Sequence, residues 1–313
     1  MRRGGLVVAL SGGVGGAKLA LGLGRVLPPE ELLVVANTGD DFEHLGLHVS
    51  PDLDTLMYAL AGLDNPETGW GRRDETWHFM ESLGALGGET WFRLGDRDLA
   101  THVERTRRLR QGETLSAVAE EFCRRLGIGP RLLPMSDDPV RTRVRTDEGW
   151  LDFQDWFVRR QCRPAVRALE FAGAAAARPQ AELLRALRGD GLRAVVVCPS
   201  NPLISIGPIL AVPGLREAIA GCGAPVVAVS PIVGGEAVKG PTARMLRELG
   251  TEPSAAAVAR LYGGLLQGYV MEEGDEGMGI AVPVFRTRTL MRTPEDREAL
   301  ARAVLAAADA LRG

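Results

Sequence analysis

The sequence predicts an α/β fold of the Rossmann-like, doubly wound class, with a mainly parallel sheet and a mostly helical insertion that forms a second lobe. Short apolar runs alternate with helical patterns, as they do in the βαβ units of parallel sheets. A glycine-rich turn follows the first run, and 45% hydrophobic with 25% charged residues is ordinary globular composition. We expect a single domain over residues 1–313, with a core at 1–63 and 166–313 and the insertion at 64–165.

The first βαβ unit is expected between residues 6 and 37. The run LVVAL at 6–10 is short and apolar, which is typical of a strand buried on both faces. After SGGVGG, the segment AKLALGLGRVL has helical spacing, and a second apolar run, LLVVAN, follows at 32–37. This order of elements predicts a right-handed crossover between two parallel strands.

Two helix starts are predicted from an N-cap residue followed by proline. Ser50 and Pro51 precede the apolar helical pattern LDTLMYALAGL, and both residue types suit these positions. Thr293 and Pro294 precede the last helical pattern, which runs to Leu311.

The insertion has a different character from the core. Residues 64–130 are rich in Arg and Glu and mostly helical, and Gly127 is placed to end one of these helices. The segment TRVRTDEGWLDFQDWFV at 142–158 predicts a β-hairpin that turns at Asp-Glu-Gly, residues 147–149.

Polar loops follow the predicted core strands, including two later strands within 193–201 and 224–235. In an open α/β sheet, ligands bind beyond the carboxyl ends of the strands, where the topology switches. If the sheet is parallel, four loops lie along this one edge: SGGVGGAK (11–18), NTGDDFEH (37–44), PSNPLISIG (199–207) and SPIVGG (230–235).

The glycine turn is expected to bind an anion, since backbone amides at a helix N-terminus can approach a phosphate and Lys18 follows. The turn lacks the Gly-Lys-Ser/Thr ending of a P-loop and the third glycine of the dinucleotide fingerprint. A tight turn without a ligand is the alternative. In the loop after the later strand, Ser200, Asn201 and Ser205 offer polar groups beside two prolines, and a purely structural turn is the alternative there.

The acidic loop after the second strand predicts a magnesium site. Asp40 and Asp41 follow the strand directly, while Asp52 and Asp54 open the next helix. A helix N-terminus favours an aspartate by ~0.3–1 kcal/mol, which accounts for Asp52 but not for Asp40 or Asp41. Carboxylates beside a phosphate-binding turn suit Mg²⁺, which takes one or two carboxylates plus phosphate oxygens.

Two polar segments of the insertion are further candidates. LGDRDLATH at 94–102 contains Arg97 between two acids, as a salt bridge or as a contact to a substrate phosphate or ring carbonyl. PMSDDPVRT at 134–142 contains Ser136 and Asp137 ahead of a proline.

Composition excludes several classes of function. A net charge of −3 favours neither a nucleic acid nor a membrane as partner. The basic run RTRRLR at 105–110 fits a solvated helix face, and no run approaches the ~20 apolar residues of a spanning helix. The four cysteines form no CxxC pair, which disfavours a zinc knuckle and fits a reduced, cytoplasmic setting. Without HExxH or G-x-S-x-G, zinc or serine hydrolysis is disfavoured.

Taken together, the motifs resemble the CofD/FbiA family of coenzyme F-420 biosynthesis. SGGVGGAK, NTGDD, SPDLDTLMY, LGDRDLATH, LLPMSDDPVRT, FQDWFV, PSNPLISIGPIL and SPIVGGEAVKGP occur in this order across nearly the whole chain. The glycine turn and SPDLDT are shared with YvcK-like nucleotide-sugar-binding regulators, whereas LGDRDLATH and PSNPLISIGPIL are more specific to the transferases.

The resemblance implies a reaction. The acceptor is the deazaflavin Fo, and the donor is a three-carbon phospho-acid, 2-phospho-L-lactate or enolpyruvyl phosphate, activated as a guanosine diphosphate ester. The terminal ribityl hydroxyl of Fo attacks the phosphorus that carries the acid, and GMP leaves. Such a transfer depends on positioning and charge neutralisation, in which Mg²⁺ on the diphosphate assists. The resemblance also implies a homodimer.

Site residues follow from the resemblance and the motifs together. Asp40 and Asp54 are the expected catalytic residues and the expected metal ligands, and a metal-bound Asp54 is a poor general base. Fo is expected near Asp54, Arg97, Ser136 and Asp137. The guanosine diphosphate is expected along Gly12, Gly13, Gly15, Gly16, Lys18, Ser200, Asn201, Pro202 and Ser205.

Two rival functions share parts of this pattern. A non-enzymatic YvcK-like regulator that binds a nucleotide-sugar shares the glycine turn but has no need for a deazaflavin pocket. A nicotinamide oxidoreductase is the other rival, and the missing third glycine argues against it.

Overall fold

The fold is built on a seven-stranded parallel sheet, in a computed structural model that describes residues 4–312. The strands lie in the order β14-β13-β10-β9-β1-β2-β5, and every neighbouring pair is parallel. Their bounds are β1 (Leu6–Ser11), β2 (Leu32–Ala36), β5 (Arg131–Pro134), β9 (Leu192–Val197), β10 (Val226–Val229), β13 (Gly268–Met271) and β14 (Val284–Arg286). The expectation of a doubly wound parallel sheet is confirmed.

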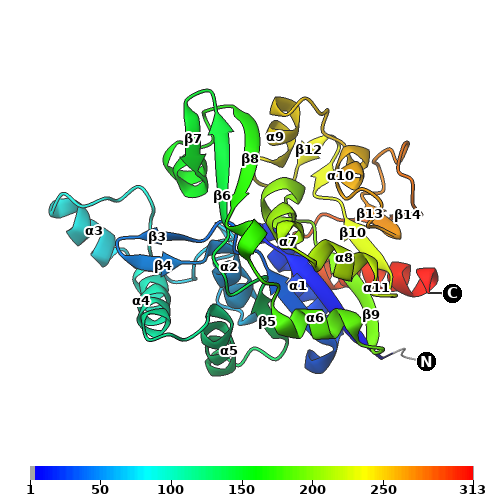
Figure 1. Ribbon diagram of the computed structural model, residues 1–313, viewed down its shortest axis with the longest axis horizontal. Helices are drawn as coiled ribbons and strands as arrows, with labels where there is room; N and C mark the ends of the chain where they lie inside the picture. The colour runs from blue at the N-terminus through cyan, green and yellow to red at the C-terminus, as the bar shows by residue number, and fades with distance from the viewer. Residues whose placement is uncertain (1–3, 313) are drawn as a thin grey trace.

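Helices cover both faces of the sheet (Figure 1). Because side chains alternate along a strand, Val7 and Ala9 join one apolar core, while Val8 and Leu10 join the other. The first core is closed by α1 (Gly13–Val26), α2 (Pro51–Leu60), α5 (Leu115–Arg125) and α11 (Pro294–Leu311). The second is closed by α6 (Ala181–Arg188), α7 (Gly207–Ala211), α8 (Leu215–Ala220), α9 (Thr242–Glu248) and α10 (Ala255–Leu261).

Beyond the sheet, further elements extend the molecule (Figure 1). A hairpin of β3 (Phe42–His44) and β4 (Leu47–Val49) packs near α4 (Asp96–Arg110), and α3 (His78–Ala85) lies farthest from the two termini. A separate antiparallel sheet is formed by β7 (Gly149–Asp152), β6 (Arg141–Thr146) and β8 (Val166–Ala172). The remaining short elements are β11 (Ile232–Val233), β12 (Glu236–Ala237), the 3₁₀ turns η1 (Pro29–Glu31) and η3 (Ala174–Ala176), and the π turns η2 (Asp155–Arg159) and η4 (Pro202–Ile206).

Most local predictions agree with the structure. Thr293 caps α11 in a capping box with Asp296, and Gly127 follows α5 with a positive φ of 69°. The predicted hairpin is β6–β7, in which Thr146 pairs with Gly149. Ser50 precedes α2 as expected, but its hydroxyl donates to Asp41 at 2.6 Å and makes no capping bond.

The segment expected to form a mostly helical lobe is divided between two environments. Its strand β5 pairs with β2 and forms the edge of the main sheet, and α5 packs on the first core. The separate antiparallel sheet has its own small apolar cluster around Val144, Phe153 and Trp156. Among residues 4–312, no helix is both long and apolar enough to span a membrane.

Candidate functional site at the switch point of the sheet

The topology of the main sheet reverses between β1 and β9, where the chain continues to β2 on one side and to β10 on the other. The loops after these two strands are joined by hydrogen bonds. The Gly12 amide donates to Ser200 Oγ at 3.0 Å, and the Ser200 hydroxyl donates to the Gly12 carbonyl at 2.8 Å. This is the position at which open α/β sheets bind ligands.

Close packing explains the glycines of the turn after β1. A Cβ at Gly12 would lie 2.3 Å from Asp52 Oδ2, and one at Gly15 would lie 2.6 Å from the Pro199 carbonyl oxygen. At Gly16, a Cβ would lie 2.3 Å from Ser200 Oγ. The turn therefore requires glycine because two loops and a helix start are pressed together, whether or not a phosphate binds there.

A cavity of about 680 Å³ opens at this edge of the sheet. All four predicted loops contribute to it, as do α2, the start of α4 and the segment that follows β7. Of the expected site residues, those that line it are Gly12, Gly13, Gly15, Lys18, Asp40, Asp54, Ser200, Asn201 and Ser205. This volume suits a ligand of nucleotide size.

A cluster of buried carboxylates, called the carboxylate pole below, lines part of the cavity. One amide nitrogen, Asn37 Nδ2, donates to Asp40 Oδ1 and to Asp52 Oδ2, each at 2.9 Å. The Gly13 amide also donates to Asp52 Oδ1 at 2.6 Å. Burial raises the pKa of Asp52 to about 6, and burial together with the nearby Asp52 raises the pKa of Asp40 well above its ordinary value.

The chemistry of this cluster fits a divalent cation. Asp40 and Asp52 are buried oxygen donors that repel each other, and Asp41 beside them has a buried Oδ1 without a hydrogen-bond partner among the described residues. Hard oxygens of this kind are the ligands that Mg²⁺ prefers. A bound cation would therefore stabilise the charged forms of Asp40 and Asp52 in particular.

Asp54 belongs to a second buried cluster. Arg105 donates to both of its carboxylate oxygens, to Oδ2 at 3.0 Å and to Oδ1 at close range. His102 lies between two acids, with Nδ1 3.7 Å from Asp54 Oδ2 and Nε2 3.3 Å from Asp98 Oδ2. Burial raises the pKa of Asp54 while Arg105 opposes this shift. Asp54, Asp98 and His102 also lie close enough together to bind a metal ion.

Five expected residues do not line the cavity in the described part of the chain. Arg97 is exposed, and its amide donates to Glu75 at 2.8 Å. Ser136 donates to the Arg178 carbonyl at 2.7 Å, and Asp137 accepts from the Ser116 amide at the start of α5. The remaining two, Gly16 and Pro202, are buried beneath the lining.

A group of aromatic side chains to which the sequence assigned no role, called the aromatic wall below, also lines the cavity. Aromatic residues are only 5% of the chain, yet six line this cavity: Tyr58, Trp70, Trp91, Phe92, Phe153 and Phe157. Phe153 and Phe157 stack at 5.3 Å between ring centroids. The available signal was the gathering of aromatics in the motifs GWG, ETWFR and FQDWFV.

Three basic residues and a histidine also line the cavity, and only Lys18 among them was expected. Arg93 lies four residues before the exposed Arg97, with its guanidinium carbon 4.0 Å from the centre of the Trp77 ring. His102 and Lys239 are the others. Arg93 and Lys239 lie in irregular segments, which have no periodicity to tell which way a side chain faces, whereas His102 lies on α4.

The fold and the cavity define a Rossmann-like α/β protein with a ligand-sized cavity at the switch point of its sheet. The particular family is shown by comparison. The chain belongs to the CofD family, since residues 7–277 match the model described as 2-phospho-L-lactate transferase CofD.

Curated relatives extend over most of the chain, and each is named phosphoenolpyruvate transferase. The protein from Streptomyces griseus is 48% identical over 277 residues, covering 87% of this chain and 86% of that one. The relative from Kitasatospora aureofaciens is 44% identical and covers 98% of both chains. The relative from Mycolicibacterium smegmatis is 39% identical and covers 96% of this chain and 97% of that one.

A more distant likeness supports the fold. A crystal structure from Bacillus halodurans, described as a member of the UPF0052 family, superposes with a TM-score of 0.63 at 14% identity. The match covers 96% of this chain and 99% of that one. At this identity the likeness concerns the architecture alone.

Proposed function

We propose that this protein transfers a phospho-three-carbon-acid group from its guanosine diphosphate ester to the terminal ribityl hydroxyl of the deazaflavin Fo, releasing GMP. The product is F-420-0 or its dehydro form. Membership of the CofD family and the shared name of the relatives support the reaction. Because these relatives are named phosphoenolpyruvate transferase, we propose the enolpyruvyl donor and hence dehydro-F-420-0.

The observation that carries the proposal is a single cavity with a carboxylate pole and an aromatic wall. A diphosphate needs charge neutralisation, and a planar tricyclic ring needs a stacking surface. A nucleotide-sugar sensor would need the first but has no use for the second. A transferase that brings a diphosphate ester to a deazaflavin needs both.

The donor fits the glycine side of the cavity. Val14 and Gly15 line it at the start of α1, where backbone amides and the helix dipole favour an anion. Ser200 and Asn201 lie beside them at the switch point.

When bound, Mg²⁺ would offset the charge of the diphosphate and of the departing GMP. Asp40 and Asp52 would hold it together. We assign Asp52 in place of the expected Asp54 because Arg105 already donates to both oxygens of Asp54.

The acceptor fits the aromatic side. Trp91, Phe92 and Arg93 follow one another along the wall, so that the rings bury the deazaflavin and the guanidinium reaches its polar edge. We therefore assign to Arg93 the role that the sequence suggested for Arg97. Asp54, which Arg105 holds in place, and the neighbouring His102 orient the attacking hydroxyl.

The test is mass spectrometry of the product formed from Fo with each of the two donors. We expect the enolpyruvyl ester to give dehydro-F-420-0 and GMP, two hydrogens lighter than the product of the lactyl ester. The nucleotide-sugar regulator would be favoured if neither product forms, the protein still binds the nucleotide, and Fo does not bind at high micromolar concentration.

A further inference from the structure

The chain uses lysine at only two positions, Lys18 and Lys239, although Lys and Arg together number 37. Both lysines line the candidate cavity. Arginine serves the surface ion pairs of this protein, for example with Glu104, Glu121 and Glu298. Lysine differs from arginine because its ammonium is a compact charge with three rotatable donors. The two exceptions to the use of arginine therefore share one location.

The two ammonium groups reach the cavity from different elements. Lys18 lies on α1, one turn beyond the glycine turn, and donates to the Met291 carbonyl at 3.0 Å. Lys239 lies between β12 and α9 and donates to the Thr68 carbonyl. Each of these bonds uses one of three N–H groups, so that each ammonium keeps two donors for a ligand.

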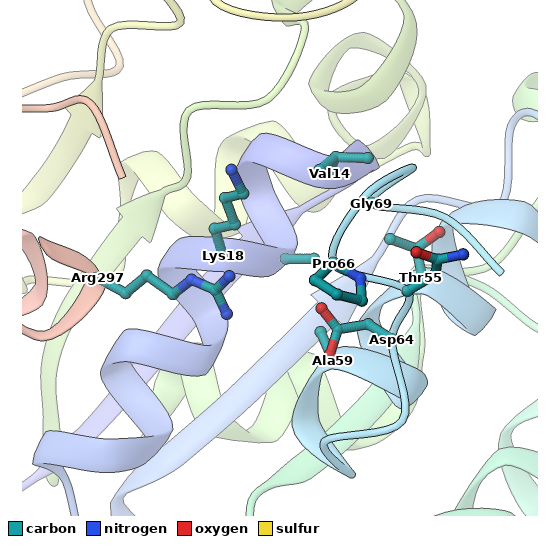
Figure 2. A pocket seen from close by; sticks show the side chains of 10 residues that line it. Val14, Lys18, Thr55, Ala59, Asp64, Pro66, Gly69 and Arg297 are labelled. Atoms are coloured by element: carbon teal, nitrogen blue, oxygen red, sulfur yellow. The ribbon is translucent and has the colours of Figure 1, made fainter. Parts of the chain in front are cut away.

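Positive charge is in excess around the pair. Arg297 reaches from α11 to the side of Lys18, while Asp64 lies across a small pocket from it (Figure 2). Burial, Arg297 and Lys239, in this order, lower the pKa of Lys18. Within residues 4–312, neither lysine has a carboxylate oxygen within 4 Å, and Asp64 is 4.0 Å from Arg73. Three cations thus surround one acid, Asp64, which raises the pKa of Lys18 by less than Arg297 or Lys239 lowers it, so that positive charge remains in excess.

We propose that Lys18 and Lys239, supported by Arg297, bind the carboxylate of the three-carbon acid on the donor. This rests on the proposed function and adds the residues that select an acid over an uncharged group. The diphosphate has Asp40, Asp52 and a cation to hold it, so that the carboxylate is the donor's remaining anion. Two ammonium groups with free donors match its two oxygens.

The test compares three ligands by isothermal titration calorimetry in the presence of Mg²⁺. The first is the guanosine diphosphate ester of enolpyruvate. The second is the same diphosphate esterified with an ethyl group, which has no carboxylate, and the third is GDP. Wild-type protein is expected to prefer the acid ester by about tenfold or more, as charge-assisted hydrogen bonds are strong. Lys239→Met and Lys18→Met should each lose most of this preference, with GDP binding by Lys239→Met within about twofold of wild type.

Two controls keep the result specific. Arg124→Met removes an exposed positive charge on α5, outside the cavity lining, and should leave the preference unchanged. Lys239→Arg keeps the positive charge and should therefore retain part of the preference. The rest should be lost because the larger guanidinium crowds Gly69, which lies so near that a Cβ added there would be 3.0 Å from Lys239 Nζ. Unfolding temperatures of all variants report whether the fold is intact.

The outcomes separate this proposal from the proposed function. A preference for the acid ester that Lys239→Met abolishes supports the lysine pair even if no transfer to Fo is detected, which would count against the transferase alone. Equal weakening of all three ligands in Lys239→Met overturns the proposal, because the lysine would then hold a phosphate or the loop. Wild-type protein that does not discriminate between the two esters overturns it as well.

Discussion

Asp40 and Asp52 share one amide nitrogen of Asn37, which lies 2.9 Å from each of them. Both carboxylates are buried, and each has a pKa above its ordinary value. The protein thus holds two acids in a place where their charged forms are disfavoured unless a cation is present.

This relationship predicts an unusual dependence of stability on pH. Burial raises the pKa of Asp52 from its ordinary value of 3.8 to about 6, so that the folded state binds more protons than the unfolded state between these two pH values. Without divalent cations, the free energy of unfolding should fall by roughly 3 kcal/mol for Asp52 as pH rises through this window, and Asp40 should extend the fall to higher pH. Thermal melts in EDTA from pH 4 to 8 measure it.

Two variants and one ion sharpen this test. Asp52→Asn should flatten the fall, whereas Asp296→Asn, which alters an exposed capping box on α11, should leave its slope unchanged. Added Mg²⁺ should raise the unfolding temperature more at pH 7.5 than at pH 5.5. If the stability of the wild-type protein in EDTA does not fall as pH rises, burial does not disfavour the charged forms of these carboxylates.

Arg105 and Asp54 form a buried pair that should be needed for the fold as well as for the reaction. Removing one partner leaves an uncompensated charge, which costs about 3–5 kcal/mol. We expect Asp54→Asn and Arg105→Met each to destabilise the protein by amounts of this order and to abolish transfer. Chemical denaturation of both single variants and of the double variant measures the coupling. If the two losses simply add in the double variant, the pair contributes nothing specific.

Arg93 and Arg97 should differ sharply in their effect on the acceptor. Both arginines are exposed, but only Arg93 lines the cavity beside the aromatic wall, while Arg97 lies on the first turn of α4 outside the lining. Arg93→Ala should weaken Fo binding about tenfold, the size of one lost hydrogen bond to a charged group, and Arg97→Ala less than twofold. Fluorescence titration of Fo checks this, and the reverse order would return the role to Arg97.

The glycine turn should tolerate no side chain at Gly15. A Cβ there would lie 2.6 Å from the Pro199 carbonyl oxygen, a contact that the backbone relieves only by moving. Gly15→Ala should therefore destabilise the protein by about 1–3 kcal/mol through overpacking. Gly189→Ala is the matched control, because its nearest contact would be 3.5 Å and its φ of −80° suits alanine. Equal stability of the two variants would show that the turn can open.

The predictable parts of the fold are those that residues near one another in the sequence determine. Thr293 and Pro294 define a helix start by their own chemistry, and apolar runs of five or six residues define the central strands. The edge strand β5 was not predicted, since four residues within a helical segment give no period. Its place in the sheet depends on pairing with β2, nearly a hundred residues earlier.

The same limit applies to the site. That Asp40 and Asp54 would line one cavity followed from the rule that parallel strands end at one edge. That Arg105 would bind Asp54 did not follow, because α4 must first be docked beside α2. Ser136 and Asp137 follow the edge strand β5, which lies two strands from the switch point, and this distance explains why they fall outside the cavity.

A crystal structure with GDP and Mn²⁺ would show whether the switch-point cavity holds a cation and a diphosphate together. Anomalous scattering locates Mn²⁺ without ambiguity. We expect a manganese peak bonded both to the Asp40 carboxylate and to a phosphate oxygen, with the nucleotide against Ser200. A nucleotide bound outside this cavity, or a manganese ion that contacts neither Asp40 nor Asp52, would contradict it.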